Sequence, residues 1–75
     1  MTKIHKLENN AQYYYDKAVN STNNGDYIKS LDYLYRAYNL DSSEKKYEIL
    51  IEMGACYALI GEHNSALKSY YKALA

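Results

Sequence analysis

This sequence of 75 residues lacks several features that would assign it to a protein class. It contains no proline, tryptophan or phenylalanine, and its one cysteine, Cys56, excludes a disulfide within the chain. No apolar segment follows Met1 as in a secretory signal, and the longest apolar run, residues 53–60, is far shorter than the ~18 residues that cross a membrane. A lone cysteine also fits a reducing compartment. We therefore expect a cytoplasmic protein with no membrane partner.

The chain also lacks an excess of charge of either sign. Nine Lys and Arg residues balance nine Asp and Glu residues, so the formal net charge is zero. Without a positive field at long range, nucleic acid is not an expected partner. Hydrophobic residues make up 48% of the chain and charged residues 24%, which is typical of a folded domain and not of a disordered segment. We expect one small all-α domain.

Motifs for catalysis and for cofactor binding are missing as well. There is no Gly-rich phosphate loop, no G-x-S-x-G and no H-E-x-x-H. His5 and His63 are far apart, and no Cys, Asp or Glu cluster around either has the spacing of metal ligands. Cys56 lies in an apolar segment, which predicts a small buried side chain and not a nucleophile. We expect no enzyme activity, no metal site and no cofactor.

What the sequence does contain is the apolar periodicity of helices. Apolar residues recur at steps of one, three and four, with no competing alternation of period two. Leu50 and Met53 are expected in the core, as are most of the eleven tyrosines. The second helix is predicted to bury the stripe Tyr27, Ile28, Leu31, Leu34, Tyr35 and Tyr38. The four predicted helices run from near Thr2 or Leu7 to 24, from 27 to 40, from about 44 to 60, and from 63 onward.

The chain also contains two copies of one unit. Gly25-Asp26 in the first copy corresponds to Gly61-Glu62 in the second, an offset of 36 residues. The turn glycine recurs where the chain reverses, because glycine readily adopts the left-handed conformation that ends a helix. Small residues recur where two helices must approach closely. Further matched pairs are Ala18 with Gly54, Ser30 with Ala66, Leu31 with Leu67, and Tyr35-Arg36-Ala37 with Tyr71-Lys72-Ala73.

The second copy resembles the tetratricopeptide repeat family, whose signature reads W-x₂-L-G-x₂-Y, then A-x₃-F, then P. The matching positions are Leu50, Met53-Gly54, Tyr57, Ala66 and Tyr70. The first copy fits more loosely, at Tyr14, Lys17-Ala18, Ser21, Ser30 and Leu34. The resemblance implies two antiparallel helix-turn-helix repeats, stacked as a short right-handed α-solenoid. Residues 1–10 would be an N-terminal extension within the first helix, 11–44 the first repeat, and 45–75 a second repeat that ends before its full length.

Three features depart from the family pattern. Ser42 replaces the closing proline, and two extra residues fall between Asp41 and Tyr47. Lys17 and Ser21 place polar groups where the family packs large apolar ones, which predicts an edge helix or a partly hydrated one.

The resemblance implies a non-catalytic module that binds a protein or peptide in a groove lined by the first helix of each repeat. Tyr15 is the best interface candidate in the Tyr13-Tyr14-Tyr15 run, although the groove positions equally fit packing against a neighbouring segment. A clamp for a terminal carboxylate is not expected, since its positions, including Glu52, carry no cation. By register, the groove residues are Gln12, Tyr15, Val19, Thr22, Glu48, Ile51, Ala55 and Ala58.

The last helix carries an apolar stripe without a partner in the sequence. Repeat proteins generally need ~3 or more units, because each unit buries its apolar face against the next. We therefore expect either a fragment of a longer repeat protein or a homo-oligomer. Two further functional alternatives are the repeat part of a peptide-sensing regulator and the accessory end of an enzyme. The expected assembly face is Leu67, Tyr70, Tyr71 and Leu74.

Overall fold

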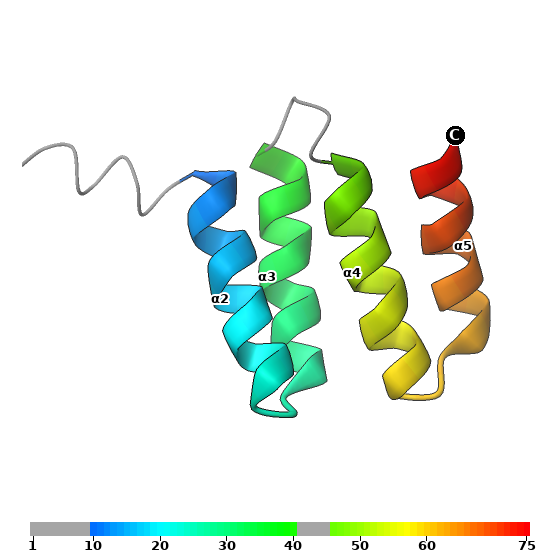
Figure 1. Ribbon diagram of the computed structural model, residues 1–75, viewed down its shortest axis with the longest axis horizontal. Helices are drawn as coiled ribbons and strands as arrows, with labels where there is room; N and C mark the ends of the chain where they lie inside the picture. Colours follow the sequence, from blue (N-terminus) through cyan, green and yellow to red (C-terminus); the bar gives the residue numbers. More distant parts are fainter. Residues whose placement is uncertain (1–9, 41–45) are drawn as a thin grey trace, which may run out of the picture.

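The computed structural model describes residues 10–40 and 46–75, and all regular secondary structure in these ranges is helical (Figure 1). The helices lie side by side in chain order and form two antiparallel hairpins, joined by packing of the second helix against the third. The predicted all-α fold of two helical hairpins is confirmed. The four helices are α2 (Ala11–Asn23), α3 (Tyr27–Leu40), α4 (Lys46–Leu59) and α5 (His63–Leu74).

The turn between α2 and α3 is closed by backbone hydrogen bonds that glycine makes possible. Gly25 has a φ of +81°, in the left-handed region that side chains with a Cβ disfavour. The amide of Asp26 donates to the carbonyl of Ser21 at 2.8 Å, and the amide of Gly25 donates to Thr22 at 2.9 Å. This pair of bonds is the Schellman motif, which satisfies the free carbonyls at a helix end.

The turn between α4 and α5 repeats this arrangement. Gly61 has a φ of +87°, and its amide donates to the carbonyl of Ala58 at 3.1 Å. The amide of Glu62 donates to Tyr57 at 2.8 Å. Each donor and acceptor lies 36 positions after its counterpart in the first turn, so the two copies share a backbone conformation and not only a residue pattern. Both predicted turns are confirmed.

Helix α2 begins at Ala11, because Asn10 caps it. The backbone of Asn10 is extended, and its side-chain Oδ1 accepts from the amide of Tyr13 at 2.9 Å. Periodicity had predicted a start near Thr2 or Leu7, but periodicity cannot register a cap. Residues 1–9 and 41–45 lie outside the described residues, and with them most of the predicted N-terminal extension and Ser42, which replaces the closing proline.

Small residues occupy the closest approaches between helices, as the repeat predicted. Ala18 of α2 is 1% exposed and Ser30 of α3 is fully buried. Gly54 of α4 packs against Tyr70 of α5 so closely that a Cβ at Gly54 would lie 2.6 Å from a ring carbon. Aliphatic residues fill the space between, and the burial predicted for Leu50, Met53 and Cys56 is confirmed. The central cluster is Ala18, Leu31, Leu34, Ala37, Ile49, Leu50, Met53 and Cys56.

The tyrosines lie at the margin of this core, and not within it as predicted. All eleven fall in the described ranges, and none is buried. Tyr14 and Tyr33, for example, pack against the central cluster with their rings stacked 6.3 Å apart, whereas Tyr35 and Tyr71 are exposed. A phenol hydroxyl needs water or a polar partner, so a tyrosine is stable where its ring is covered and its tip is free.

Exposure along α3 and α4 differs in part from what the apolar pattern of the sequence suggests. On α3, Ile28 is 65% exposed, and the small residues Ser30 and Ala37 take the buried positions, because α3 must approach α2 closely. Helix α4 contains most of the longest apolar run of the sequence, yet it exposes Tyr47, Ile51 and Leu59. On α2, Lys17 is exposed as the edge position predicted, but Ser21 is buried. Part of the apolar side-chain surface of α4 is thus exposed to solvent.

Candidate functional site

A small polar cluster holds the first hairpin against α4. The Ser30 hydroxyl donates to the carbonyl of Ala18 at 2.9 Å and lies 2.7 Å from the Thr22 hydroxyl. The Cys56 sulfur lies 3.5 Å from Ser30 Oγ and 3.6 Å from Thr22 Oγ1. Thr22, predicted to line the groove, therefore takes part in the packing between the two hairpins.

Tyr15 lies between α2 and α4, which are the first helices of the two hairpins. Its side chain is half-buried on α2, and the carboxylates of Glu48 and Glu52 on α4 are close enough to affect its ionisation. Burial, followed by Glu52, Glu48 and Asp16, raises the pKa of the Tyr15 hydroxyl above its usual value. The phenol is thus a neutral hydroxyl surrounded by carboxylates. We call Tyr15, Asp16, Glu48 and Glu52, together with Gln12, which donates to Asp16 at 2.9 Å, the acidic surface of α2 and α4.

The predicted groove residues divide between two surfaces. Gln12 and Glu48 are exposed, and Val19 and Ala55 are half-buried. Ile51, 44% exposed, lies instead with residues of α5 around an open apolar cavity of about 600 Å³. The sequence register missed this division, because it does not show that the face shared by Glu48 and Ile51 borders α2 on one side and α5 on the other. We call the cavity lining the C-terminal apolar surface: Tyr47, Ile51, Tyr70, Ala73 and Leu74.

Residues of the predicted assembly face contribute to this surface. Leu74 is 83% exposed and lines the cavity, while Tyr70 lines it with its ring packed on Gly54. Leu67 and Tyr71 are also exposed, at 52% and 69%, but do not line the cavity.

The repeat shows what covers the equivalent surface in the first hairpin. Counting back by the repeat offset, the C-terminal apolar surface corresponds to residues that pack in or against the central cluster, where α4 joins the first hairpin. Leu34 and Ala37 are fully buried there, whereas their counterparts Tyr70 and Ala73 are half-buried. The five counterparts are Ala11, Tyr15, Leu34, Ala37 and Tyr38.

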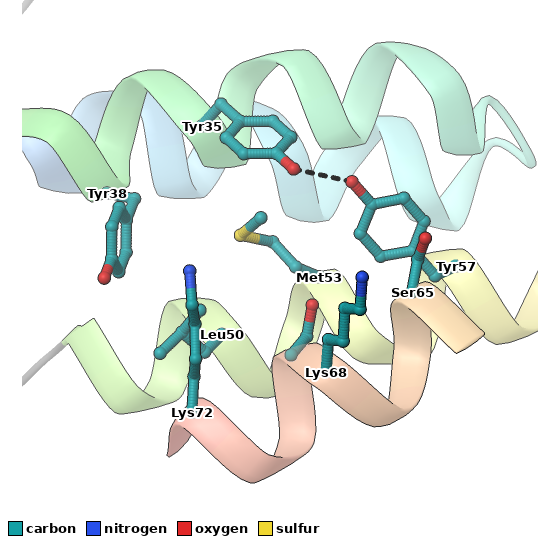
Figure 2. A pocket seen from close by; sticks show the side chains of 9 residues that line it. Tyr35, Tyr38, Leu50, Met53, Tyr57, Ser65, Lys68 and Lys72 are labelled. Atoms are coloured by element: carbon teal, nitrogen blue, oxygen red, sulfur yellow. Dashed lines mark hydrogen bonds between the residues drawn. The ribbon is translucent and has the colours of Figure 1, made fainter. Parts of the chain in front are cut away.

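A second cavity, of about 180 Å³, lies between α3 and α5 with α4 at its floor (Figure 2). Tyr35 and Tyr57 meet at one end, where their hydroxyl oxygens are 2.6 Å apart. Lys68 and Lys72 extend from α5 along the opening. We call it the tyrosine–lysine cleft, lined by Tyr35, Tyr38, Tyr57, Lys68 and Lys72, with Ser65, Ser69, Leu50 and Met53.

The hydroxyl of Tyr57 in this cleft keeps its proton at physiological pH. Burial raises the pKa of Tyr57 to about 12, with contributions from the hydrogen bond to Tyr35, from the Tyr35 charge and from Glu62. Sequence reasoning did not single out this cleft. The available signal was the change from Asp32 to Lys68 between the two copies, which replaces a carboxylate by an ammonium group at equivalent positions.

The structure also bears on metal binding and on membrane insertion. Within residues 10–40 and 46–75, no group of three or more His, Cys, Asp or Glu side chains could hold a metal ion. In the same ranges no helix has the length and apolar character needed to cross a membrane.

Comparison with known proteins gives one informative similarity. The chain is 33% identical over 72 residues to the photosystem I assembly protein Ycf3 of Prochlorococcus marinus (strain NATL1A). The aligned region covers 95% of this chain but 42% of that protein, so the chain spans less than half the length of the relative it matches. No protein-family model matches the chain, and no solved structure matches it significantly. The chain is thus similar, over nearly its whole length, to part of a protein named for assembly.

Proposed function

We propose that this chain is a non-catalytic protein-interaction module built from two tetratricopeptide-like repeats. The two matched hairpins support this reading, as does the similarity to a protein whose name describes the assembly of photosystem I. The right-handed stacking of the repeats and the assignment of residues 11–44 and 45–75 to them are part of the same proposal. The partner would be a protein or a peptide segment, and the cytoplasm the expected compartment.

The C-terminal apolar surface is the observation that carries this proposal. Its counterparts in the first hairpin are covered by α4, yet Ile51 and Leu74 are 44% and 83% exposed. Exposed apolar patches of this kind commonly mark protein interaction sites. A further repeat or a second copy of the chain would cover the surface with the same geometry that α4 uses on the first hairpin.

The acidic surface of α2 and α4 is the proposed peptide site. Tyr15 offers a ring and a neutral hydroxyl, and Asp16, Glu48 and Glu52 supply negative charge around it. An apolar peptide segment with a Lys or Arg side chain complements such a surface, because the cation would be attracted by three carboxylates at once. Within the described residues no basic side chain forms an ion pair with these carboxylates, since the one ion pair there, Asp32 with Arg36, lies on α3.

Two alternatives concern the rest of the protein. The repeats could be the sensing part of a regulator, or the accessory end of an enzyme. The full-length gene distinguishes them, since a DNA-binding segment favours the first and a catalytic domain the second.

Selection of binders from a random-peptide library on the immobilised chain tests the proposal. We expect enriched peptides with a basic residue beside apolar ones, and loss of binding in the Glu48→Lys/Glu52→Lys variant. Ile51→Glu tests the C-terminal apolar surface in the same assay, and Ile28→Glu is its control, since Ile28 is exposed on α3 away from both surfaces. The proposal would be contradicted if the peptides bound equally well to the Glu48→Lys/Glu52→Lys variant and to Ile51→Glu, provided that both variants keep their helicity.

A further inference from the structure

The tyrosine–lysine cleft is a candidate binding site that the proposed protein-binding surfaces do not use. Its floor is apolar, formed by Leu50 and Met53, which are 6% and 4% exposed. Its opening is polar, with Lys68 and Lys72 on one side and the hydroxyls of Tyr35 and Tyr57 at the end (Figure 2). An apolar floor with a few polar groups above it is the usual form of a small-ligand site.

The charged residues that line the cleft are all positive, and Glu62, whose charge contributes to the raised pKa of Tyr57, is not among the lining residues. Lys68 and Lys72 are one turn apart on α5, and neither forms an ion pair within residues 10–40 and 46–75. No acidic residue lines the cleft. A third ammonium borders it, since Lys46 Nζ lies 4.4 Å from the ring centre of Tyr38.

The first hairpin carries a different pair of charges on the equivalent helix face. There the equivalent pair is Asp32 and Arg36, whose side chains form an ion pair at 3.5 Å. In the second hairpin Lys68 takes the place of Asp32, so an attractive pair becomes two like charges at i, i+4. Like charges at this spacing repel each other and weaken a helix slightly, and an anion bound between them would relieve the repulsion. The substitution therefore points to an anion.

The tyrosine pair adds a directed donor. Each hydroxyl carries one proton, and the 2.6 Å contact between Tyr35 and Tyr57 uses one of the two. The other proton remains available to an acceptor. The raised pKa of Tyr57, about 12, keeps the proton of that hydroxyl in place in the physiological range. Ser65 and Ser69 supply two further hydroxyls along the α5 side.

We propose that the tyrosine–lysine cleft binds an oxyanion, a carboxylate or a phosphate, that is attached to a small apolar group. The apolar group lies on Leu50 and Met53, and the oxyanion lies between the lysine ammoniums and the tyrosine hydroxyl. A protein residue and a free small molecule can both carry this chemistry. The oxyanion itself is the common requirement.

Titration of the 75-residue chain, followed by NMR of its backbone amides, tests this proposal. The probes are phenyl phosphate, benzoate and, as a cation of similar size, benzylamine. We expect saturable shifts around Tyr57 and Lys68 with both anions and none with benzylamine. Lys68→Gln and Lys72→Gln should each weaken phenyl phosphate binding by at least ~5-fold, as loss of a charge-assisted hydrogen bond in a partly solvated site implies.

Lys29→Gln is the matched control, because Lys29 is exposed on α3 and changes the net charge equally without lining the cleft. We expect its affinity within ~2-fold of that of the wild type. A phosphotyrosine peptide that binds ~10-fold more tightly than phenyl phosphate would identify a protein residue as the ligand, and equal affinity a free small molecule. Absence of saturable shifts with both anions, equal binding of benzylamine, or equal weakening by Lys29→Gln would overturn the proposal.

Discussion

At the scale of single residues, hydroxyl groups decide where side chains can lie. Tyr57 keeps its ring against the core and satisfies its hydroxyl through Tyr35. Ser30, although fully buried, has partners in Ala18, Thr22 and Cys56, so its burial does not leave a polar group without a hydrogen bond. The hydroxyls of Tyr57 and Ser30 are therefore both satisfied by hydrogen-bond partners on other helices.

The raised pKa of Tyr57 predicts a loss of stability in alkali. The folded-state pKa is about 12 and the ordinary value 10.0, so the unfolded chain loses this proton first. The contribution to the free energy of unfolding is therefore complete below about pH 10 and declines as the pH rises towards about 12. Urea unfolding across this range should show a steeper decline for the wild type than for Tyr57→Phe.

A matched control separates this effect from the titration of lysines and of exposed tyrosines. Tyr71 is 69% exposed, and Tyr71→Phe should leave the alkaline decline as steep as in the wild type. If Tyr57→Phe and wild type declined in parallel, the hydrogen-bonded pair would not be present in solution.

Residues of this kind also limit what could be predicted from sequence. The stripe on α3 included Ile28 and Tyr35, which are exposed, and omitted Ser30, which is buried. Periodicity counts apolar letters, but burial on α3 depends on how closely α2 approaches, and a serine permits a closer approach than an isoleucine. The tyrosine–lysine cleft was missed for a related reason, since its residues come from three helices with no shared motif.

At the scale of helices, small residues and turn glycines determine the pairing. Both turns were predictable, because Gly25 and Gly61 recur at the repeat offset and only a left-handed residue closes such a turn. The start of α2 could not be predicted in this way, because Asn10 caps the helix through its side chain and its position bears no relation to the apolar period. Between α4 and α5, Gly54 is required by the ring of Tyr70.

Gly54→Ala should destabilise the protein although alanine favours helices. A Cβ at this position would lie 2.6 to 2.9 Å from three ring carbons of Tyr70, so the ring or the helix must move. We expect a net loss of up to about 2 kcal/mol in the free energy of unfolding, since an overpacking cost of ~1–3 kcal/mol is offset in part by the ~1 kcal/mol gain in helix propensity. Urea denaturation measures this difference.

The same substitution in a Tyr70→Leu background provides the control. Leucine lacks the ring atoms that the new Cβ would meet, so Gly54→Ala should there be neutral or stabilising. An equal cost in both backgrounds would show that the glycine is needed for a reason other than contact with Tyr70.

At the scale of the whole molecule, the two copies differ in what covers them. The first hairpin is covered by α4, whereas the second exposes the C-terminal apolar surface. The net charge of zero also conceals a division, with carboxylates around Tyr15 and lysines around the tyrosine–lysine cleft. The repeat and the exposed stripe of α5 were predictable from sequence; the participation of Ile51 required the structure, because it depends on how α4 is rotated between its neighbours.

Sedimentation equilibrium at micromolar concentration tests most directly whether the C-terminal apolar surface is made to be covered by protein. We expect the wild-type chain to self-associate, because covering exposed apolar side chains is worth about 25 cal/mol per Å². Ile51→Glu and Leu74→Glu should each shift the equilibrium to monomer, and Ile28→Glu, on another exposed position, should not. A stable, cooperatively folded wild-type monomer at these concentrations would contradict the account.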